Sequence, residues 1–258
     1  MPKITLNAIE LFYEIHGAGE PLLLIHGLGS SSRDWEYQLP AFTEHYQVIT
    51  CDVRGHGQSA KPPGPYNVPM FADDIIQLMQ ALDIAPAHVL GISMGGMIAY
   101  QLAVDHPEMV KSLIAVNCNP ELPVRNFKDR LAIWQREIIV QLIGMRKMGQ
   151  VLSERLFIKP DQEKLRQIFV QRWAENDPKA YLAAMRAIVG WSVVAELPKL
   201  TMPVLVIAAD QDYSFVDDKT AYIPLMPNAQ MLVIENSRHA TPVEHPEAFN
   251  QAVLSFYR

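Results

Sequence analysis

One segment of the chain reads Val89-Leu90-Gly91-Ile92-Ser93-Met94-Gly95-Gly96-Met97-Ile98-Ala99-Tyr100. It begins as a short apolar run, which predicts a buried β-strand, and continues with apolar residues at helical spacing. Between the two, Gly91, Ser93 and Gly95 form a Gly-x-Ser-x-Gly pattern. This pattern is typical of a tight strand-to-helix turn that leaves a serine hydroxyl exposed above a sheet, and its glycines let strand and helix approach closely. We therefore predict that Ser93 is a nucleophile.

Strands and helices alternate on both sides of this segment. Two short strands at the N-terminus look antiparallel, and continuous apolar runs then predict buried strands. The predicted strands cover residues 3–7, 11–16, 21–25, 46–51, 87–92, 111–116, 202–209 and 229–235. Helices are predicted from about residue 35, over 70–82, from the serine turn to about 106, from about 216, and over 243–257. This order predicts an α/β fold with a mostly parallel central sheet flanked by helices.

The alternation breaks between Asn119 and Pro198, where no strong strand occurs. Apolar residues recur there at helical spacing, so we predict a helical lid (cap) insertion over residues 119–198, with the core domain formed by 1–118 and 199–258. Three helix faces carry the apolar residues Leu131, Trp134, Ile138 and Leu142; Leu165, Ile168, Phe169 and Trp173; and Tyr181, Met185, Ile188 and Val189. Most should pack between lid and core, and a few should line an apolar substrate chamber.

Composition limits the possible partners. The net charge of −6 and the lack of a Lys/Arg cluster argue against nucleic-acid binding. No apolar run approaches the roughly 20 residues of a membrane helix, and the N-terminus lacks a secretion signal. Cys51 and Cys118 each end a strand-like run, which favours buried thiols in a reducing compartment. We expect a cytoplasmic protein without membrane contact, structural metal or cofactor, and nothing in the sequence indicates the oligomeric state.

A serine nucleophile needs a base, and His239 is our candidate. It stands in a loop directly after the last predicted strand, where its side chain would reach over the sheet edge toward Ser93. The other histidines flank strands, occupy glycine-rich turns or precede prolines: His16, His26, His45, His56, His88, His106 and His245. We therefore predict that His239 removes the serine proton.

The histidine in turn needs a carboxylate that fixes its tautomer. Asp210 and Asp212 both follow the penultimate strand, whereas Asp217 and Asp218 fit the start of a helix better. We favour Asp212 and keep Asp210 as the alternative. The order Ser93, Asp212, His239 completes a predicted triad.

A tetrahedral intermediate also requires donors for its oxyanion. The backbone N–H of Met94 follows the serine at a helix N-terminus, where the helix dipole favours negative charge. The N–H of Leu28 is the simplest second donor, because Gly27 and Gly29 around it permit unusual backbone geometry. The alternative is that these two glycines only form a tight turn.

Taken together, these pieces resemble the α/β-hydrolase family over nearly the whole chain. The matching segments are His26-Gly27-Leu28-Gly29, Asp52-Val53-Arg54-Gly55-His56-Gly57-Gln58-Ser59, Gly91 to Gly96, Asp212, and His239 followed by His245-Pro246-Glu247. Ser93 differs from the aspartate of haloalkane dehalogenases and epoxide hydrolases, and Leu28 from the aromatic residue of many cofactor-free haloperoxidases. The stretches Arg54 to Gly57 and Pro62 to Tyr66 resemble esterases and 3-oxoadipate enol-lactonases more than carbon–carbon bond hydrolases.

The sequence therefore predicts a carboxylesterase-type serine hydrolase. It should cleave esters of small to medium apolar substrates through an acyl-enzyme intermediate, with a small-molecule ester or lactone as its partner. The lid has no basic cluster, which argues against strongly anionic substrates. A lactonase, a carbon–carbon bond hydrolase or a perhydrolase could use the same triad. A small-molecule receptor of this fold with little turnover is the alternative from another class.

Overall fold

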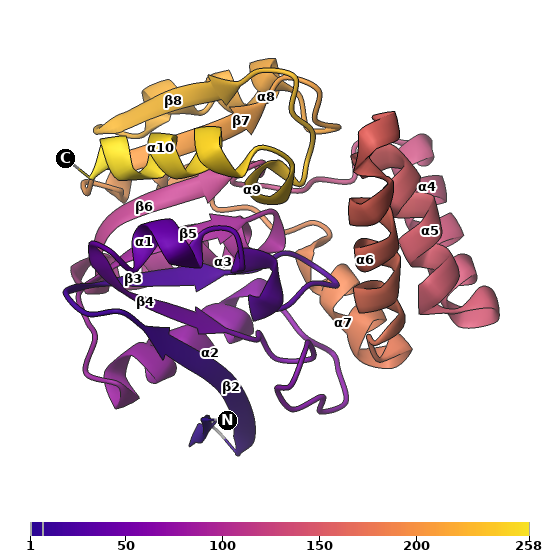
Figure 1. Cartoon of the computed structure of the whole chain (residues 1–258), viewed down its shortest axis with the longest axis horizontal. Coiled ribbons are helices and arrows are strands. Elements are labelled where there is room, and N and C mark those ends of the chain that lie inside the picture. Colours follow the sequence, from indigo (N-terminus) through magenta and orange to yellow (C-terminus); the bar gives the residue numbers. More distant parts are fainter. Residues whose placement is uncertain (1, 7, 258) are drawn as a thin grey trace.

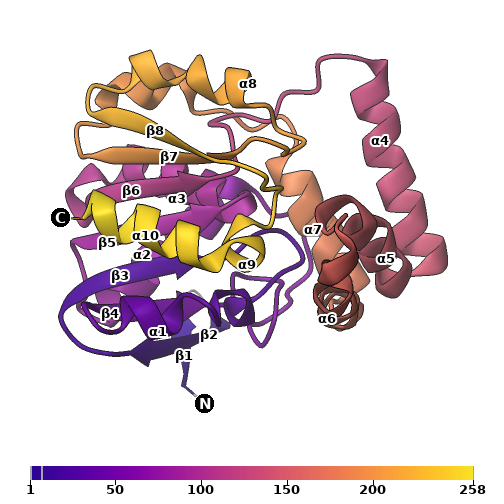
Figure 2. The same cartoon turned by 45° about the horizontal axis from the view of Figure 1, so that its top comes forward.

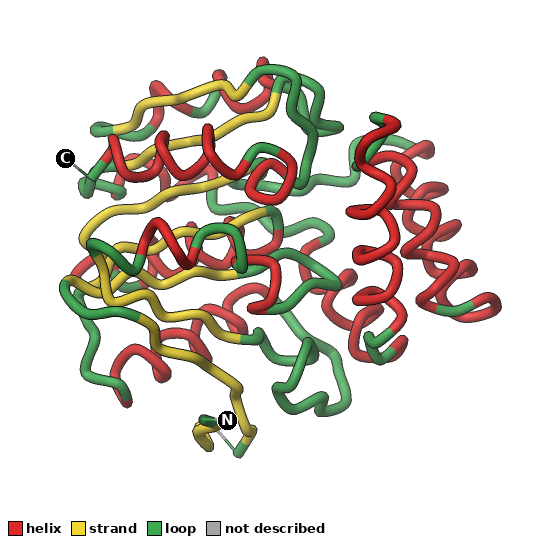
Figure 3. Tube along the Cα trace, in the orientation of Figure 1, coloured by secondary structure: helices red, strands yellow, loops and turns green. Residues whose placement is uncertain are grey.

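A computed structural model of the chain describes residues 2–6 and 8–257 and has an eight-stranded sheet at its centre (Figures 1 and 3). The strands are β1 (Lys3–Leu6), β2 (Ile9–His16), β3 (Glu20–Ile25), β4 (Tyr46–Cys51), β5 (Ala87–Ile92), β6 (Val110–Val116), β7 (Val204–Ala209) and β8 (Ala229–Ile234). Their spatial order is β1-β2-β4-β3-β5-β6-β7-β8. Only β1–β2 and β2–β4 pair in antiparallel fashion, and all other pairs are parallel. The predicted α/β-hydrolase fold with a mostly parallel sheet is confirmed.

Helices cover both faces of the sheet because the strand residues alternate between two apolar clusters. Leu22 and Leu24 pack with Phe42 and Phe249 on one face, beneath α1 (Leu39–Phe42) and α10 (Pro246–Phe256). Leu23 and Ile25 join the larger cluster on the other face, under α2 (Val68–Ala81) and α3 (Met94–Asp105). These strands are therefore buried on both sides, as their continuous apolar runs indicate.

The other helices outside the stretch between β6 and β7 are short, and the C-terminal helix differs from its prediction. They are η1 (Ser32–Trp35), η2 (Pro107–Met109), α8 (Val216–Thr220), η6 (Ile223–Leu225) and α9 (Thr241–Glu244). The single helix predicted over 243–257 is wrong, since α9 and α10 are separated at His245, with φ −135° and ψ 61°. Pro246 disfavours helical geometry in the residue before it and begins a new helix, where its missing N–H costs nothing.

A run of helices separates β6 from β7. It contains α4 (Phe127–Ile138), η3 (a π-helix, Ile139–Ile143), α5 (Met145–Leu156), η4 (Pro160–Gln162), α6 (Glu163–Ala174), α7 (Pro178–Ile188) and η5 (Val194–Lys199). We call α4 to α7 the helical insertion. Figures 1 and 2 show it gathered beyond the end of the sheet to which the parallel strands point. That end carries the candidate site, and the division into core and lid domains stays a prediction.

Two of the three apolar faces expected to pack between lid and core contribute buried residues, and the third is largely exposed. Trp173, Tyr181 and Met185 are buried together in a cluster of their own. Trp134 and Leu142, in contrast, remain 58% and 79% exposed. Helical spacing correctly indicated a common side of the chain but could not show whether another element covers it. Among the described residues, no helix is both long and apolar enough to span a membrane.

Candidate functional site

Ser93 lies on a strained turn between β5 and α3. Its backbone has φ 56° and ψ −119°, a conformation that side chains with a Cβ rarely adopt. The N–H of Ser93 donates to the carbonyl of Val116 (2.9 Å), which ties the turn to the end of β6. The residue is half-buried at the end of the sheet. Met94 begins α3 directly after Ser93. Its backbone N–H, like the others of the first helical turn, has no hydrogen-bond partner within the helix.

The glycines of the turn are dictated by close packing. A Cβ on Gly91 would lie 2.1 Å from the carbonyl oxygen of Gly95, and one on Gly95 would lie 2.1 Å from that of Ile25. A Cβ on Gly96 would lie 2.3 Å from the Sγ of Cys118, whose thiol is free and buried. Larger residues would therefore push α3 away from the sheet.

The loop after β3 lies against the serine. Because β3 pairs with β5, with Ile25 opposite Gly91, the two strands end side by side. A Cβ on Gly27 would come within 3.4 Å of the Ser93 Cβ. Leu28 is half-buried next to it and packs against both the core and the helical insertion. The structure thus brings together Ser93, Met94 and Leu28.

A buried histidine anchors this loop. The Val53 N–H donates to His26 Nε2 (2.9 Å), which makes Nε2 the acceptor and leaves Nδ1 to donate to the Gly27 carbonyl (2.8 Å). The neighbouring Asp52 is also buried, and it accepts hydrogen bonds from the backbone N–H groups of Ser32 and Gln58, both at 2.7 Å. His26 and Asp52 therefore hold loops in place and are not available as the base.

Asp212 and His239 meet at the ends of β7 and β8. His239 Nδ1 lies 2.9 Å from Asp212 Oδ1. A carboxylate only accepts hydrogen bonds, so Nδ1 carries a proton, and in the neutral ring Nε2 is then the acceptor. Burial raises the pKa of Asp212, but its interactions with His239, Ser214 and Lys219 outweigh burial and leave the pKa below its ordinary value. Asp210 instead accepts from the Ser237 N–H (3.0 Å), so it is Asp212 that the structure places against the histidine.

Tyr213 links this pair to the serine. Its ring stacks on the His239 ring with centroids 4.3 Å apart. Burial raises the pKa of the Tyr213 hydroxyl, and interactions with Arg136 and Ser93 partly oppose that rise. The tyrosine is nevertheless 65% exposed, so it lies at the surface of the site. Sequence reasoning missed Tyr213, and the only available signal was its position directly after Asp212.

Asn117 holds the histidine loop and was also missed. It follows β6 with φ 47°, and its side-chain amide donates to the carbonyl of His239 (3.0 Å) and to Thr241 Oγ1 (2.8 Å). The side-chain oxygen of Asn117, Oδ1, accepts a hydrogen bond from the Ala209 N–H (2.8 Å) at the end of β7. A buried asparagine after an apolar strand was the signal, since a buried amide must find partners.

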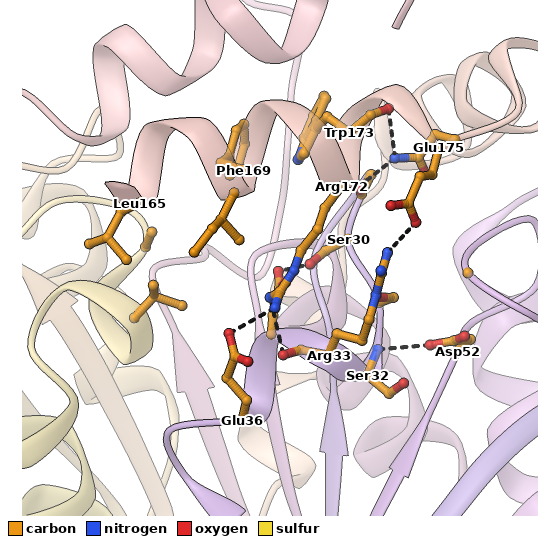
Figure 4. A pocket seen from close by; sticks show the side chains of 18 of the residues that line it. Ser30, Ser32, Arg33, Glu36, Asp52, Leu165, Phe169, Arg172, Trp173 and Glu175 are labelled. Carbon is orange, nitrogen blue, oxygen red and sulfur yellow. Dashed lines mark hydrogen bonds and ion pairs between the residues drawn. The ribbon is translucent and has the colours of Figure 1, made fainter. Parts of the chain in front are cut away.

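A pocket of about 240 Å³ adjoins the site between α6 and η1. Leu165, Phe169 and Trp173 form an apolar wall that extends from α6 (Figure 4). The triad residues do not line this pocket, but Gly29 and Ala240, the neighbours of Leu28 and His239, do. Ion pairs close its rim: Arg172 to Asp34 (3.2 Å) and Glu36 (2.8 Å), and Arg33 to Glu175 (2.5 Å).

No cluster of metal-ligating side chains occurs among residues 2–6 and 8–257.

Comparisons with known proteins point to one family. A family model described as the alpha/beta hydrolase fold matches residues 20–246. The chain is 31% identical over 257 residues to 3-oxoadipate enol-lactonase 2 of Acinetobacter baylyi, covering 97% of this chain and 94% of that protein. It is 30% identical over 261 residues to a Stutzerimonas stutzeri protein provisionally named carbamate hydrolase RutD, covering 95% of each. A solved esterase from Thermogutta terrifontis superposes with a TM-score of 0.89 at 26% identity, over 100% of this chain and 97% of that one.

Proposed function

The chain belongs to the α/β-hydrolase family, and we propose that it is a serine hydrolase that cleaves carboxylic esters of small to medium apolar substrates. The observation that carries the proposal is the contact between His239 and Asp212 beside the strained turn of Ser93. A histidine held by a carboxylate, with its other nitrogen free, is the base that a serine hydroxyl requires.

In the proposed reaction, the Ser93 oxygen attacks the ester carbonyl carbon while His239 Nε2 takes the hydroxyl proton. The N–H groups of Met94 and Leu28 stabilise the oxyanion, and each donor lowers the activation barrier by roughly 3 kcal/mol. The intermediate collapses to an acyl-enzyme when the imidazolium returns its proton to the leaving alkoxide. In the second half, His239 takes a proton from water while the water oxygen bonds to the acyl carbon. The bond between that carbon and the Ser93 oxygen then breaks, the imidazolium returns its proton to Ser93, and the acid leaves.

The substrate's apolar part is proposed to occupy the pocket between α6 and η1, whose wall of Leu165, Phe169 and Trp173 offers no charge. The helical insertion would then act as a lid, since it supplies this wall. Its residue types fit a short or medium acyl or alkoxy group.

The test is turnover of short-chain p-nitrophenyl esters by Ser93→Ala and His239→Ala. We expect each variant to lose at least about 10³-fold in kcat, and the wild type to form a Ser93 acyl adduct visible by mass spectrometry when the reaction is quenched early. Ser192→Ala and His106→Ala change exposed residues of the same types and serve as matched controls. Undiminished turnover in either site variant would sink the assignment.

A second candidate function is hydrolysis of a lactone or ester that carries a carboxylate. Arg136 of α4 donates to the Tyr181 hydroxyl and lies over the Tyr181 and Trp173 rings at 5.4 and 6.0 Å. It interacts electrostatically with Tyr213, whose ring stacks on His239. Within residues 2–6 and 8–257 no carboxylate pairs with this guanidinium, so a substrate carboxylate could. An oxoadipate lactone, named for the Acinetobacter baylyi relative, has this chemistry.

Kinetics separate the two candidates. If Arg136 binds a substrate carboxylate, Arg136→Met should raise KM for a carboxylate-bearing lactone by about 10- to 100-fold, the effect of one lost charged hydrogen bond. A neutral ester of equal size should be unaffected by the same change. Equal effects on both substrates would reject the carboxylate role, and Arg186→Met, at an exposed arginine of α7, is the control.

A further inference from the structure

Lys219 is an ammonium buried behind the candidate triad. It belongs to the short helix α8, yet only 1% of the residue is exposed. Burial lowers the pKa of Lys219, and the nearby carboxylate of Asp212 opposes that shift. An ammonium removed from water is costly unless charged and hydrogen-bonding partners surround it. The groups that contact the Lys219 ammonium therefore indicate its role.

Lys219 contacts Ser214 and Asp212, and Ser214 itself is hydrogen-bonded to Asp212. Lys219 Nζ donates to the Ser214 carbonyl and to Ser214 Oγ (2.8 Å), and it lies 3.6 Å from Asp212 Oδ2. The Ser214 hydroxyl donates to that same Oδ2. The other carboxylate oxygen, Oδ1, contacts His239. Each oxygen of Asp212 thus has its own partner, the histidine on one side and a serine–lysine pair on the other.

The other groups that face this cluster do not replace the lysine. Cys118 lies nearby at the end of β6, and burial raises the pKa of its thiol to about 12, which keeps it neutral. Asp218 interacts with Lys219 from its own helix, and Tyr213 covers the far side of the His239 ring. Arg136 acts on Tyr213 from the helical insertion. Among the described residues, Lys219 is the cation that pairs with Asp212.

We propose that Lys219 is a positioning residue of the triad, which acts through Ser214 to hold the Asp212 carboxylate toward His239 and offsets its negative charge. The proposal rests on the proposed function, because it assigns the charge behind that base. A carboxylate next to an imidazole favours the protonated ring, and a cation on the carboxylate's far side reduces this effect. Lys219 therefore opposes the preference that the Asp212 carboxylate gives to the protonated ring.

Loss of the Lys219 charge should change both the pH profile and kcat. Lys219→Met leaves the Asp212 charge uncompensated, so the imidazolium is favoured and the acid limb of the kcat/KM profile moves to higher pH, by about 0.5 to 1 pH unit. Looser positioning of Asp212 should also lower kcat, by about tenfold at the pH plateau, with little change in KM. Lys219→Arg retains the charge and should restore most of the acid limb.

The experiment measures pH profiles of p-nitrophenyl acetate turnover for wild type, Lys219→Met, Lys219→Arg and Ser214→Ala, with Lys199→Met at an exposed lysine as the control. Ser214→Ala breaks the bridge without removing the buried charge, so it is the deciding variant if Lys219→Met fails to fold. A Lys219→Met protein with native circular dichroism, reduced kcat and an unmoved acid limb would overturn the proposal, because a merely structural role predicts that result. A Ser214→Ala protein with native circular dichroism and wild-type kcat would also overturn it, because the bridge would then not position Asp212.

Fluorophosphonate labelling of Ser93 keeps this test separate from the proposed function. The labelling rate reports the same base without requiring ester turnover. Labelling with no turnover of any ester would reject the esterase proposal, and the pH dependence of labelling in the same variants would still decide the role of Lys219. An identical labelling profile in wild type and folded Lys219→Met would reject that role.

Discussion

The carboxyl end of the sheet and the helical insertion above it are specified to very different degrees. At the sheet, a Cβ on Gly95 would meet a backbone oxygen at 2.1 Å, and Trp35 is 1% exposed. In the insertion, nothing lies within 4 Å of a Cβ on Gly144, and Trp134 is 58% exposed. The proposed chemistry therefore lies where backbone and side chains leave no room for an added carbon atom, whereas the insertion leaves such room at Gly144 and exposes Trp134.

The largest expected effect is a loss of kcat at the end of the sheet, compared with a small change in KM in the insertion. Asp212→Asn leaves a neutral amide that no longer enforces the productive His239 tautomer, and we expect kcat for a short ester to fall by about 10⁴-fold. Phe169→Ala, in the insertion, removes a ring stacked on Trp173 at 5.1 Å and should change KM by about tenfold or less. Steady-state kinetics of both variants checks the contrast, and a larger kcat loss in Phe169→Ala would abolish it.

The next expected effect compares two tryptophans. Trp35→Ala opens a cavity in the buried cluster on the α1 side of the sheet and should lower the free energy of unfolding by about 3–5 kcal/mol. Trp134→Ala removes a largely solvated ring of α4 and should cost about 0.5 kcal/mol or less. Urea unfolding monitored by circular dichroism measures both. A large cost at Trp134 would mean that its surface is covered in solution.

Two glycines sharpen the comparison on the scale of the backbone. Gly95→Ala drives a methyl group into the carbonyl oxygen of Ile25 and should destabilise the protein by about 3 kcal/mol. Gly144→Ala meets no neighbour, but its φ of 96° strains an alanine, for a cost of about 1 kcal/mol. Thermal unfolding of the pair gives the difference, and equal midpoints would contradict the packing argument.

The smallest expected effect is a pH dependence located in the core. Burial lowers the pKa of His56 to about 3, while an unfolded histidine keeps its ordinary value of 6.5. His56 Nδ1 lies 3.1 Å from the Arg54 carbonyl, and Nε2 is buried without a partner among the described residues. The unfolded chain therefore binds a proton first as the pH falls, and His56 removes stability at about 1.4 kcal/mol per pH unit between pH 6.5 and 3.

Urea unfolding at pH 6.5 and 5 should differ by roughly 2 kcal/mol through this residue. His56→Gln is expected to flatten the dependence, whereas His106→Gln, at an exposed histidine, should leave it unchanged. An equally steep dependence in His56→Gln would show that other groups cause it.

Much of this molecule follows from local patterns. The strands over 46–51 and 87–92 were predicted at their observed bounds, because both faces of each are covered and continuous apolar runs mark this. The serine turn was predicted because only glycine tolerates the approach of α3 to β5. The buried thiols of Cys51 and Cys118 were likewise predicted correctly.

The rest was decided by contacts between residues far apart in the chain. Asp210 and Asp212 stand two residues apart after the same strand, and only the positions of the loops after β7 and β8 place Asp212 on His239. The same holds for Lys219, which α8 places 3.6 Å from Asp212 Oδ2. Sequence by itself determined which residue types stand at the strand ends. Tertiary structure decided which of them meet, because those distances depend on packing that no local periodicity encodes.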